Sequence, residues 1–131
     1  SAAIDRWVLN VTRNGVKTLT LLISNDATYT LPSSIFNCST LTKLQLFQCV
    51  FKPPNPFRGF QNLITLRLQG TTFAPTTSHC VIKAPHLANL SLYLCHGTQY
   101  LNIVSPGLES LYVRDNHNYL VLNCFMNCKN L

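Results

Sequence analysis

Apolar residues recur along this chain with one fixed spacing. In five segments an aliphatic residue is followed by two variable residues, a leucine, one further residue and a second aliphatic residue, a pattern written LxxLxL. The copies span residues 16–21, 41–46, 63–68, 87–92 and 108–113. Their starting points are 25, 22, 24 and 21 residues apart, and Leu131 stands where a sixth copy would begin. Such regular recurrence predicts a repeat protein in which every copy forms the same structural unit.

The end of each copy alternates apolar and polar positions, which predicts a short β-strand with one buried and one exposed face. Strands are expected near residues 18–22, 43–47, 65–69, 89–93 and 110–114. Stacked copies pair these strands in parallel, because the chain returns behind the sheet between one copy and the next. Independent strands of a β-sandwich would instead be separated by turns about every 8 to 12 residues, without a shared leucine register.

The LxxLxL core and a period within about 20 to 29 residues are typical of leucine-rich repeats. We therefore predict an α/β fold, a right-handed leucine-rich-repeat solenoid with a curved parallel β-sheet on its concave face. Loops and short helical turns are expected on the convex face, where prolines favour irregular connections over long helices. Pro32 is expected to open one such helical turn.

The start of the chain follows a different period. Ile4, Trp7, Val8 and Val11 are three or four residues apart, which predicts an amphipathic helix near residues 4–12. A solenoid needs capping units because a terminal repeat otherwise exposes its leucines, and this helix would serve as the first cap.

Length and composition are those of one folded domain with an unusual surface. Of the 131 residues 47% are hydrophobic, which excludes disorder as the main state, and only 11% are charged. The formal net charge of +6 admits an acidic partner. No run of like charges predicts nucleic-acid binding, and no apolar run predicts a membrane span or a signal peptide. Because the chain stops in mid-repeat, we expect residues 1–131 to be a leucine-rich-repeat domain fragment of about five repeats.

Several longer stretches carry a more specific signature. They are Ile4-Asp-Arg-Trp7, Leu31-Pro-Ser-Ser-Ile-Phe-Asn-Cys38, Leu44-Gln-Leu-Phe-Gln-Cys49-Val-Phe-Lys-Pro-Pro54, Phe57-Arg-Gly-Phe-Gln-Asn-Leu63 and Leu90-Ser-Leu-Tyr-Leu-Cys95. They resemble the plant F-box proteins that carry leucine-rich repeats, often with a C-terminal FBD region. The likeness covers nearly the whole chain and is strongest from residue 4 to residue 73. Two features depart from that family: residues 76–87 lack its usual Cys-Pro-Leu-Leu-Glu stretch, and these 131 residues contain no F-box.

The resemblance implies a protein-binding module, the substrate-recognition region of a Skp-cullin-F-box ubiquitin ligase. Such a region has no catalytic residues, because other subunits transfer the ubiquitin. A protein substrate would lie on the concave face, and a Skp-type adaptor would be reached only through an F-box absent from this chain.

The candidate partner-binding residues are the exposed positions of the predicted strands, which alternate with the buried leucines. Aromatic residues and arginine dominate binding energies at protein interfaces, while small polar residues let a partner approach. Two alternatives stay open, an unused solvated face and a small anionic ligand held by the cations. The predicted site comprises Lys43, Gln45, Phe47, Thr65, Arg67, Gln69, Asn89, Ser91, Tyr93, Ser110, Tyr112 and Arg114, with Thr18, Thr20 and Leu22 beside them.

Metal binding and catalysis are poorly supported by the sequence. Cys38 and Cys128 share one repeat position and Cys49 and Cys95 share another, so stacking explains them as small buried residues. Cys124 and Cys128 lack a second pair of ligands for zinc. With four carboxylates and isolated glycines, we predict no enzyme, no metal and no cofactor.

Three sequons, at Asn10, Asn37 and Asn89, bear on where the protein resides. About two are expected by chance in this composition, so they do not establish secretion. Unpaired thiols favour a cytoplasmic or nuclear location. The alternative is an extracellular or immune-receptor leucine-rich-repeat domain, which would have glycosylated asparagines and paired cysteines.

Overall fold

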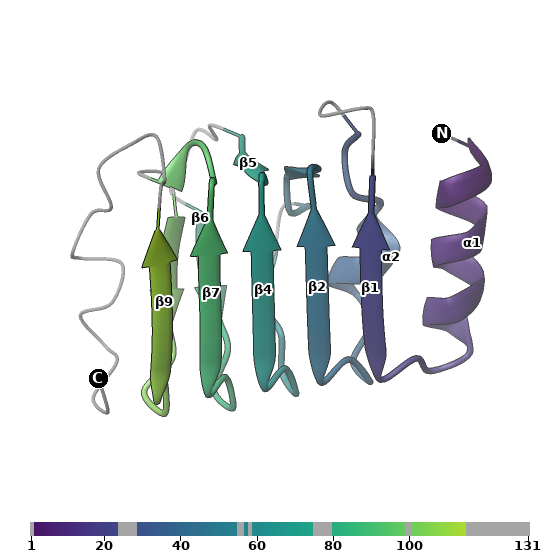
Figure 1. Cartoon of the computed structure of the whole chain (residues 1–131). Helices are drawn as coiled ribbons and strands as arrows, with labels where there is room; N and C mark the ends of the chain where they lie inside the picture. Colours follow the sequence, from purple (N-terminus) through teal and green to yellow (C-terminus); the bar gives the residue numbers. More distant parts are fainter. Residues whose placement is uncertain are drawn as a thin grey trace.

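A five-stranded parallel sheet dominates the computed structural model, which describes residues 2–23, 29–54, 57, 59–74, 80–98 and 101–114 (Figure 1). The order in the sheet is β1-β2-β4-β7-β9, so spatial neighbours come from consecutive repeats. The predicted leucine-rich-repeat solenoid with a parallel sheet is therefore confirmed. Its strands are β1 (Thr18–Leu22), β2 (Lys43–Phe47), β4 (Thr65–Gln69), β7 (Asn89–Tyr93) and β9 (Ser110–Arg114).

The leucines of successive copies lie side by side in this sheet. Backbone pairing aligns Leu19 with Leu44 and Leu44 with Leu66, and the same register continues through β7 and β9. A slip of one residue would turn every leucine toward solvent, so the buried face fixes the register. In β9 the equivalent side chains, Leu111 and Val113, are half-buried. The buried leucines of the other four strands are Leu19, Leu21, Leu44, Leu46, Leu66, Leu68, Leu90 and Leu92.

A bifurcated hydrogen bond recurs where the chain enters each strand. The carbonyl oxygen of Lys17 accepts from the amides of Thr42 and Lys43, at 2.8 and 3.1 Å. The carbonyls of Thr42, Ile64 and Ala88 each accept two amides of the following coil in the same way. The coils are thus bonded to one another before the strand pairing begins.

Three strands are followed by a residue in the left-handed backbone region. This residue stands at the same repeat position in each copy, with φ of 58° at Gln48, 61° at Gly70 and 55° at Leu94. The conformation turns the chain away from the sheet, and only glycine adopts it without steric cost. The next residue in each copy is small and fully buried: Cys49, Thr71 and Cys95.

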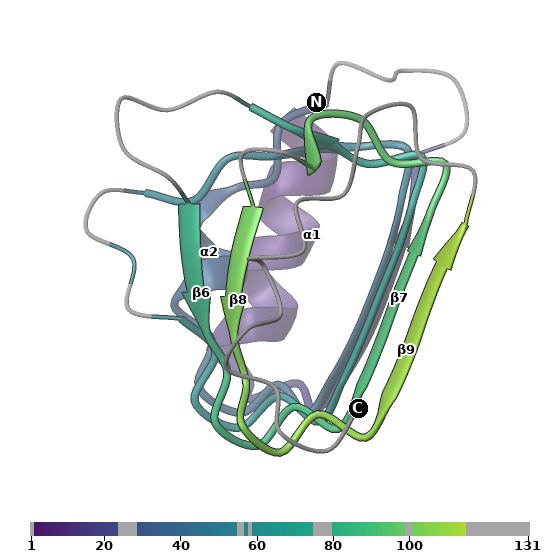
Figure 2. The same cartoon turned by 90° about the vertical axis from the view of Figure 1, so that its left-hand side faces the viewer.

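Short strands also pair outside the main sheet. β3 (Val50–Phe51) pairs in parallel with β5 (Thr72–Phe73), which lies beyond the tip of β4 in Figure 1. Behind the main sheet, β6 (Cys80–Lys83) pairs in parallel with β8 (Leu101–Val104) (Figure 2). The prediction of loops and short helical turns on this side is incomplete, because extended segments cover it as well. Alternate residues of β8 are buried, a strand pattern that lies outside the LxxLxL repeat.

Aromatic rings fill the core near the short helix α2 (Ser33–Phe36), which follows Pro32 as predicted. The ring of Phe36 lies 5.1 Å from that of Phe51 and 5.2 Å from that of Phe57, both edge to face. This arrangement is the favourable one for aromatic quadrupoles. Within the described residues the cluster comprises Phe36, Phe51, Phe57, Phe60 and Phe73.

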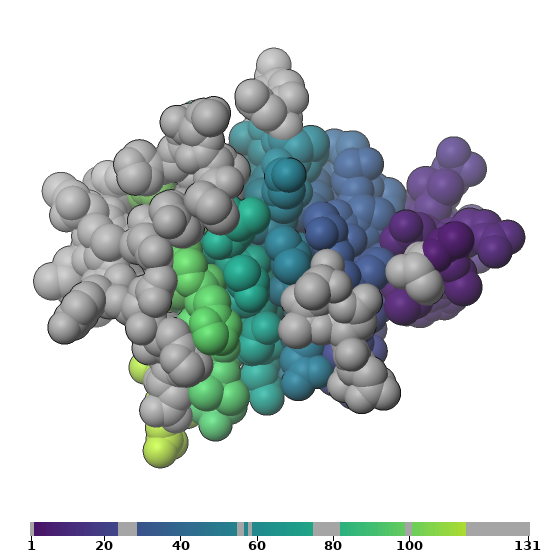
Figure 3. Space-filling view, turned by 90° about the horizontal axis from the view of Figure 1, so that it is seen from above, coloured from purple at the N-terminus to yellow at the C-terminus, as the bar shows by residue number. Residues whose placement is uncertain are grey.

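Helix α1 (Ala2–Arg13) covers the β1 end of the solenoid, and the coils follow it in chain order in the view from above (Figure 3). Val8 is fully buried, and Ile4 and Val11 pack against the core at partial exposure. The placement of Trp7 on the same apolar face is wrong, because its side chain is 47% exposed. Helix α1 contacts the coils along one side only, so fewer of its apolar side chains are buried than their spacing in the sequence suggests.

A buried tyrosine ties the segment before α2 to helix α1. The hydroxyl of Tyr29 donates a hydrogen bond to a carboxylate oxygen of Asp5. Burial of the phenol, followed by the hydrogen bond and charge of Asp5, raises the pKa of Tyr29 well above its usual value. The contact anchors the helical cap to the first coil.

Candidate functional site

The predicted site residues all lie on the exposed side of the five-stranded sheet, called the open face below. Figure 1 looks onto this side, with α2 and β6 behind the strands. Side chains alternate along a strand, so the first, third and fifth residues of each strand belong to the open face. Its members, all half-buried or exposed, are Thr18, Thr20, Leu22, Lys43, Gln45, Phe47, Thr65, Arg67, Gln69, Asn89, Ser91, Tyr93, Ser110, Tyr112 and Arg114.

Strand register arranges the open face in three rows that cross the strands. Neighbouring side chains within a row are about 4.8 Å apart, the spacing of paired strands. From β2 to β9, the first row is Lys43, Thr65, Asn89 and Ser110, the second is Gln45, Arg67, Ser91 and Tyr112, and the third is Phe47, Gln69, Tyr93 and Arg114.

A shallow depression of about 340 Å³ lies over β4, β7 and β9. Small side chains form its floor, because Ser91 stands between the larger side chains of Arg67 and Tyr112 in the second row and Ser110 lies beside Asn89 in the first row. The amide of Asn89 donates to the hydroxyl of Thr65 at 3.3 Å, which holds one polar group of the first row in place. The structure therefore brings five predicted residues together around one hollow: Arg67, Asn89, Ser91, Ser110 and Tyr112.

The charges of the open face have one sign. Lys43, Arg67 and Arg114 are its cations, and none of its fifteen described side chains is acidic. The two acidic residues within the described ranges lie elsewhere, Asp5 on α1 and Glu109 on the turn before β9. This surface can therefore attract a negatively charged partner.

Apolar groups are exposed in two places on the open face. Leu22 is 65% exposed beside the half-buried Phe47 at the ends of β1 and β2. On the other side of the face, Tyr112 is 48% exposed next to the depression. Side chains of these kinds supply most of the contact energy when a protein docks.

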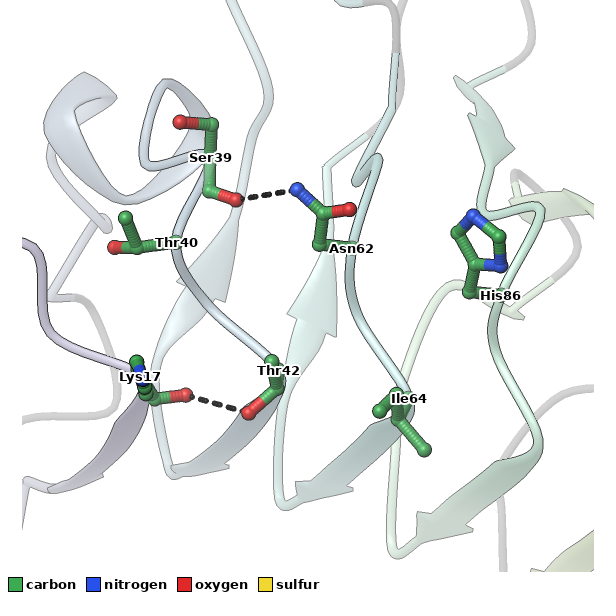
Figure 4. Close-up of a pocket in the computed structure, with 7 residues that line it drawn as sticks. All are labelled: Lys17, Ser39, Thr40, Thr42, Asn62, Ile64 and His86. Atoms are coloured by element: carbon green, nitrogen blue, oxygen red, sulfur yellow. Dashed lines mark hydrogen bonds between the residues drawn. The ribbon is translucent and has the colours of Figure 1, made fainter.

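A second groove, which the sequence analysis did not single out, runs along the strand entries (Figure 4). Its volume is about 790 Å³, and it is wide open to solvent. Hydrogen bonds fix its walls, since the amide of Asn62 donates to the carbonyl of Ser39 at 2.8 Å and the hydroxyl of Thr42 to that of Lys17 at 3.1 Å. A sequence signal for this groove exists, because the second position of the first three LxxLxL copies lines it. The lining residues are Lys17, Ser39, Thr40, Thr42, Asn62, Ile64 and His86.

The cysteines behave mainly as core residues. Cys49 and Cys95 are fully buried free thiols, and burial raises the pKa of Cys49 to about 12 and that of Cys95 above its usual value. Cys38 is also a free thiol but only half-buried, because it sits at the edge between α1 and the next coil. Cys124 and Cys128 lie outside the described residues. Among the described residues, no three His, Cys, Asp or Glu side chains gather as a metal site would require.

Asn89, the asparagine of the third sequon, lies on the open face, where its side chain is exposed. In the part of the chain that the structure describes, neither helix has the length and apolar character needed to cross a bilayer.

Comparison with known proteins identifies relatives of this chain. The family model described as "FBD-associated F-box protein At5g56370, LRR repeats" matches residues 4–128. The F-box/FBD/LRR-repeat protein At1g13570 of Arabidopsis thaliana is 38% identical over 84% of this chain and 26% of its own length. The putative F-box protein At3g44060 is 29% identical over 88% and 34% of the two chains, and the putative F-box/LRR-repeat protein At3g58920 is 32% identical over 69% and 21%, both from the same plant.

The chain thus spans between about a fifth and a third of the length of these relatives. No solved structure matches it. The family match extends across all five leucine-rich copies, and the fold is the solenoid that such repeats form. The chain therefore belongs to the leucine-rich-repeat region of the FBD-associated F-box proteins, and such repeats are protein-interaction modules.

Proposed function

We propose that this chain is the substrate-recognition region of a Skp-cullin-F-box ubiquitin ligase and holds a target protein on the open face. The family supports the ligase context, and the open face supports the place of binding. The observation that carries most weight is the depression of about 340 Å³, where an arginine and an exposed tyrosine flank small polar side chains. A partner's side chain fits such a hollow without displacing the sheet.

In this proposal the chain binds and performs no chemistry. The Skp-type adaptor is held by an F-box elsewhere in the full-length protein, and ubiquitin is transferred by other subunits. Free thiols at Cys38, Cys49 and Cys95 support a reducing compartment, the cytoplasm or the nucleus. The relatives reported above are all F-box proteins, so the family favours this role over that of an extracellular receptor.

Site-specific photo-crosslinking in plant cells tests the proposal directly. A benzophenone amino acid replaces Tyr112 on the open face of the full-length protein, and in a matched control it replaces Trp7, which is equally exposed on α1. We expect a protein to be captured from position 112 and not from position 7. That protein should become longer-lived when the F-box protein is deleted.

Two results would contradict the proposal. One is capture that is equally efficient from both positions, which would place the partner elsewhere. The other is a captured protein whose lifetime does not depend on the F-box protein, which would leave a binding site without a role in degradation.

A further inference from the structure

One arginine stands at the edge of the depression over β4, β7 and β9 with no acidic side chain beside it. Arg67 is the middle residue of β4, and its side chain is exposed. The side chains that surround it in the register carry only amides and hydroxyls: Gln45, Thr65, Gln69 and Ser91. Inside the described ranges, the guanidinium of Arg67 has neither a hydrogen-bond nor an ion-pair partner. Its planar fork of donors can therefore pair with an incoming anion.

Hydroxyl groups line the rest of the depression. Ser91 stands next to Arg67 in the second row and Tyr112 follows on β9, with about 4.8 Å between neighbouring strands. Ser110 lies beside them in the first row. Within the part of the chain that the structure describes, these three hydroxyls have no hydrogen-bond partner. A small group placed above Ser91 would therefore meet a cation on one side and hydroxyl donors around it.

This lining favours an anion over the other groups that a partner could insert. An apolar side chain would cover the guanidinium and the hydroxyls without replacing the hydrogen bonds that they make to water, which is costly. A lysine or arginine of the partner would be repelled by Arg67. A carboxylate accepts two parallel hydrogen bonds from a guanidinium and keeps lone pairs for the neighbouring hydroxyls.

The charge of the depression distinguishes a carboxylate from a phosphate. A phosphorylated side chain carries about −1.5 to −2 charges at pH 7 and is usually bound by a cluster of arginines. Among the described residues that line the depression, Arg67 is the one that carries a charge. Lys43 and Arg114 lie in other rows of the open face and do not line it. One carboxylate has the single negative charge that Arg67 balances.

We propose that the depression binds one side-chain carboxylate of the target protein, an aspartate or glutamate that projects from the partner's surface. This inference rests on the proposed function and names the chemistry of the group that the target inserts. The guanidinium of Arg67 donates to both carboxylate oxygens, and the hydroxyl of Ser91 at the floor donates to one of them. The exposed ring of Tyr112 forms the opposite wall. Once the partner covers the hollow, the loss of water strengthens the ion pair.

Blocked pentapeptides test the proposal with the 131-residue chain itself. They are acetylated and amidated and share the sequence Gly-Ser-X-Ser-Gly, where X is glutamate, glutamine or phosphoserine. Binding is followed by the amide chemical shifts of protein labelled with nitrogen-15. We expect the glutamate peptide to shift the amides of residues 89–91 and 110–112 and to bind at least about fivefold more tightly than the glutamine peptide. The phosphoserine peptide should bind no more tightly than the glutamate peptide.

Two variants of the open face locate the site. Arg67→Gln should weaken the glutamate peptide by about tenfold, which corresponds to 1.4 kcal/mol. Lys43→Gln is the matched control, because it removes an equal charge from the same face but outside the depression, and it should change the affinity by less than about twofold. Both side chains lie on the open face, so the amide spectra of the two variants should remain those of the folded protein.

Three results would overturn the proposal. Equal affinity for the glutamate and glutamine peptides would show that the carboxylate is not recognised. Equal losses in Arg67→Gln and Lys43→Gln would show diffuse attraction by the positive face instead of a site. Tighter binding of the phosphoserine peptide, or of Gly-Ser-Gly-Ser-Gly with a free C-terminal carboxylate, would assign the hollow to a phosphorylated side chain or to a chain end.

The outcome also separates this inference from the proposed function. If crosslinking at position 112 captures a target whose binding is unaffected by Arg67→Gln, the docking face stands and the inserted carboxylate is wrong. If the glutamate peptide binds as expected but no protein is captured, the carboxylate site stands and the role in substrate recognition is wrong.

Discussion

The five-stranded sheet and the strands outside it come from the same coils, yet their backbone pairing extends over different lengths. In the sheet, five residues per coil keep one register through four consecutive strand pairs. Outside the sheet, within the described residues, β3 pairs with β5 over two residues and β6 with β8 over four residues. Single parallel bridges continue the β3-β5 ladder from Thr30 to Val50 and from Thr72 to His96. Backbone hydrogen bonds keep the strands of the sheet in register, whereas side-chain packing within each coil shapes the opposite side. Substitutions in these two parts of the coil should therefore differ in their effect on stability, and the largest loss is expected in the sheet.

A charge in the leucine face of the sheet should unfold the whole stack. Leu66 is fully buried in the central strand β4, so Leu66→Asp places an unpaired carboxylate in the core. We expect a loss of more than about 4 kcal/mol in the free energy of unfolding, and thus no cooperative transition in urea followed by circular dichroism. Thr65→Asp, the neighbouring residue on the open face, should keep its transition. A normal transition in Leu66→Asp would contradict the assignment of the two faces.

A methyl group at one glycine behind the sheet should be nearly as damaging. A Cβ added at Gly59, where φ is 100°, would lie 1.9 Å from the carbonyl oxygen of Lys83. We expect Gly59→Ala to cost about 2 to 3 kcal/mol in urea denaturation. At Gly107 the nearest atom would be 3.9 Å away, so Gly107→Ala should change stability by less than about 1 kcal/mol. Similar costs at both glycines would show that the close approach at Gly59 is relaxed by the backbone.

Alkaline pH should weaken the core next to the turn positions. Burial raises the pKa of Cys49 to about 12 and also raises the pKa of Cys95, so the folded state holds both thiols protonated. In the unfolded chain these thiols ionise near pH 8.5, and stability is therefore present below that pH and lost as the pH rises toward 12. We expect a loss of about 1 to 2 kcal/mol by pH 10. In Cys49→Ala the dependence of unfolding free energy on pH should be shallower, and an unchanged dependence would exclude this thiol as its source.

Substitutions at the left-handed turn position should change the free energy of unfolding by small amounts of opposite sign. Gln48 adopts φ of 58° at a steric cost that glycine avoids, so we expect Gln48→Gly to stabilise the fold by up to about 1 kcal/mol. Gly70→Ala should cost about 1 kcal/mol, because Gly70 has the same conformation and an added Cβ would lie 3.2 Å from Cγ of Gln48. Thermal unfolding of the two variants measures both changes. Changes of the same sign would mean that the turn tolerates either residue equally.

The sheet and its exposed face could be predicted from sequence because the two-residue alternation of a β-strand determines both which side chains are buried and which are exposed. Once Leu44 and Leu46 face the core, Lys43, Gln45 and Phe47 must face outward, so the LxxLxL spacing predicts the candidate site as well as the fold. The depression over β4, β7 and β9 depends on relative side-chain sizes in neighbouring coils. The pattern within single strands predicts those residues but not the hollow between them.

The strands outside the main sheet were less predictable because they are too short to show an alternating pattern of their own. β3 and β5 are two residues long and exist only because consecutive coils bring Val50 beside Thr72. At the helical cap, the spacing of apolar residues could not show that Trp7 lies beyond the narrow contact of α1 with the first coil. In both places tertiary packing decides which residues are covered.

The unequal lengths of the coils have a consequence for how this protein can vary. Although successive copies start 25, 22, 24 and 21 residues apart, their strands stay aligned residue for residue. Insertions and deletions on the rear of a coil therefore leave the positions of the open face where they were. The chemistry of that face can change by replacing outward side chains one at a time, while the rest of the molecule gains or loses residues independently.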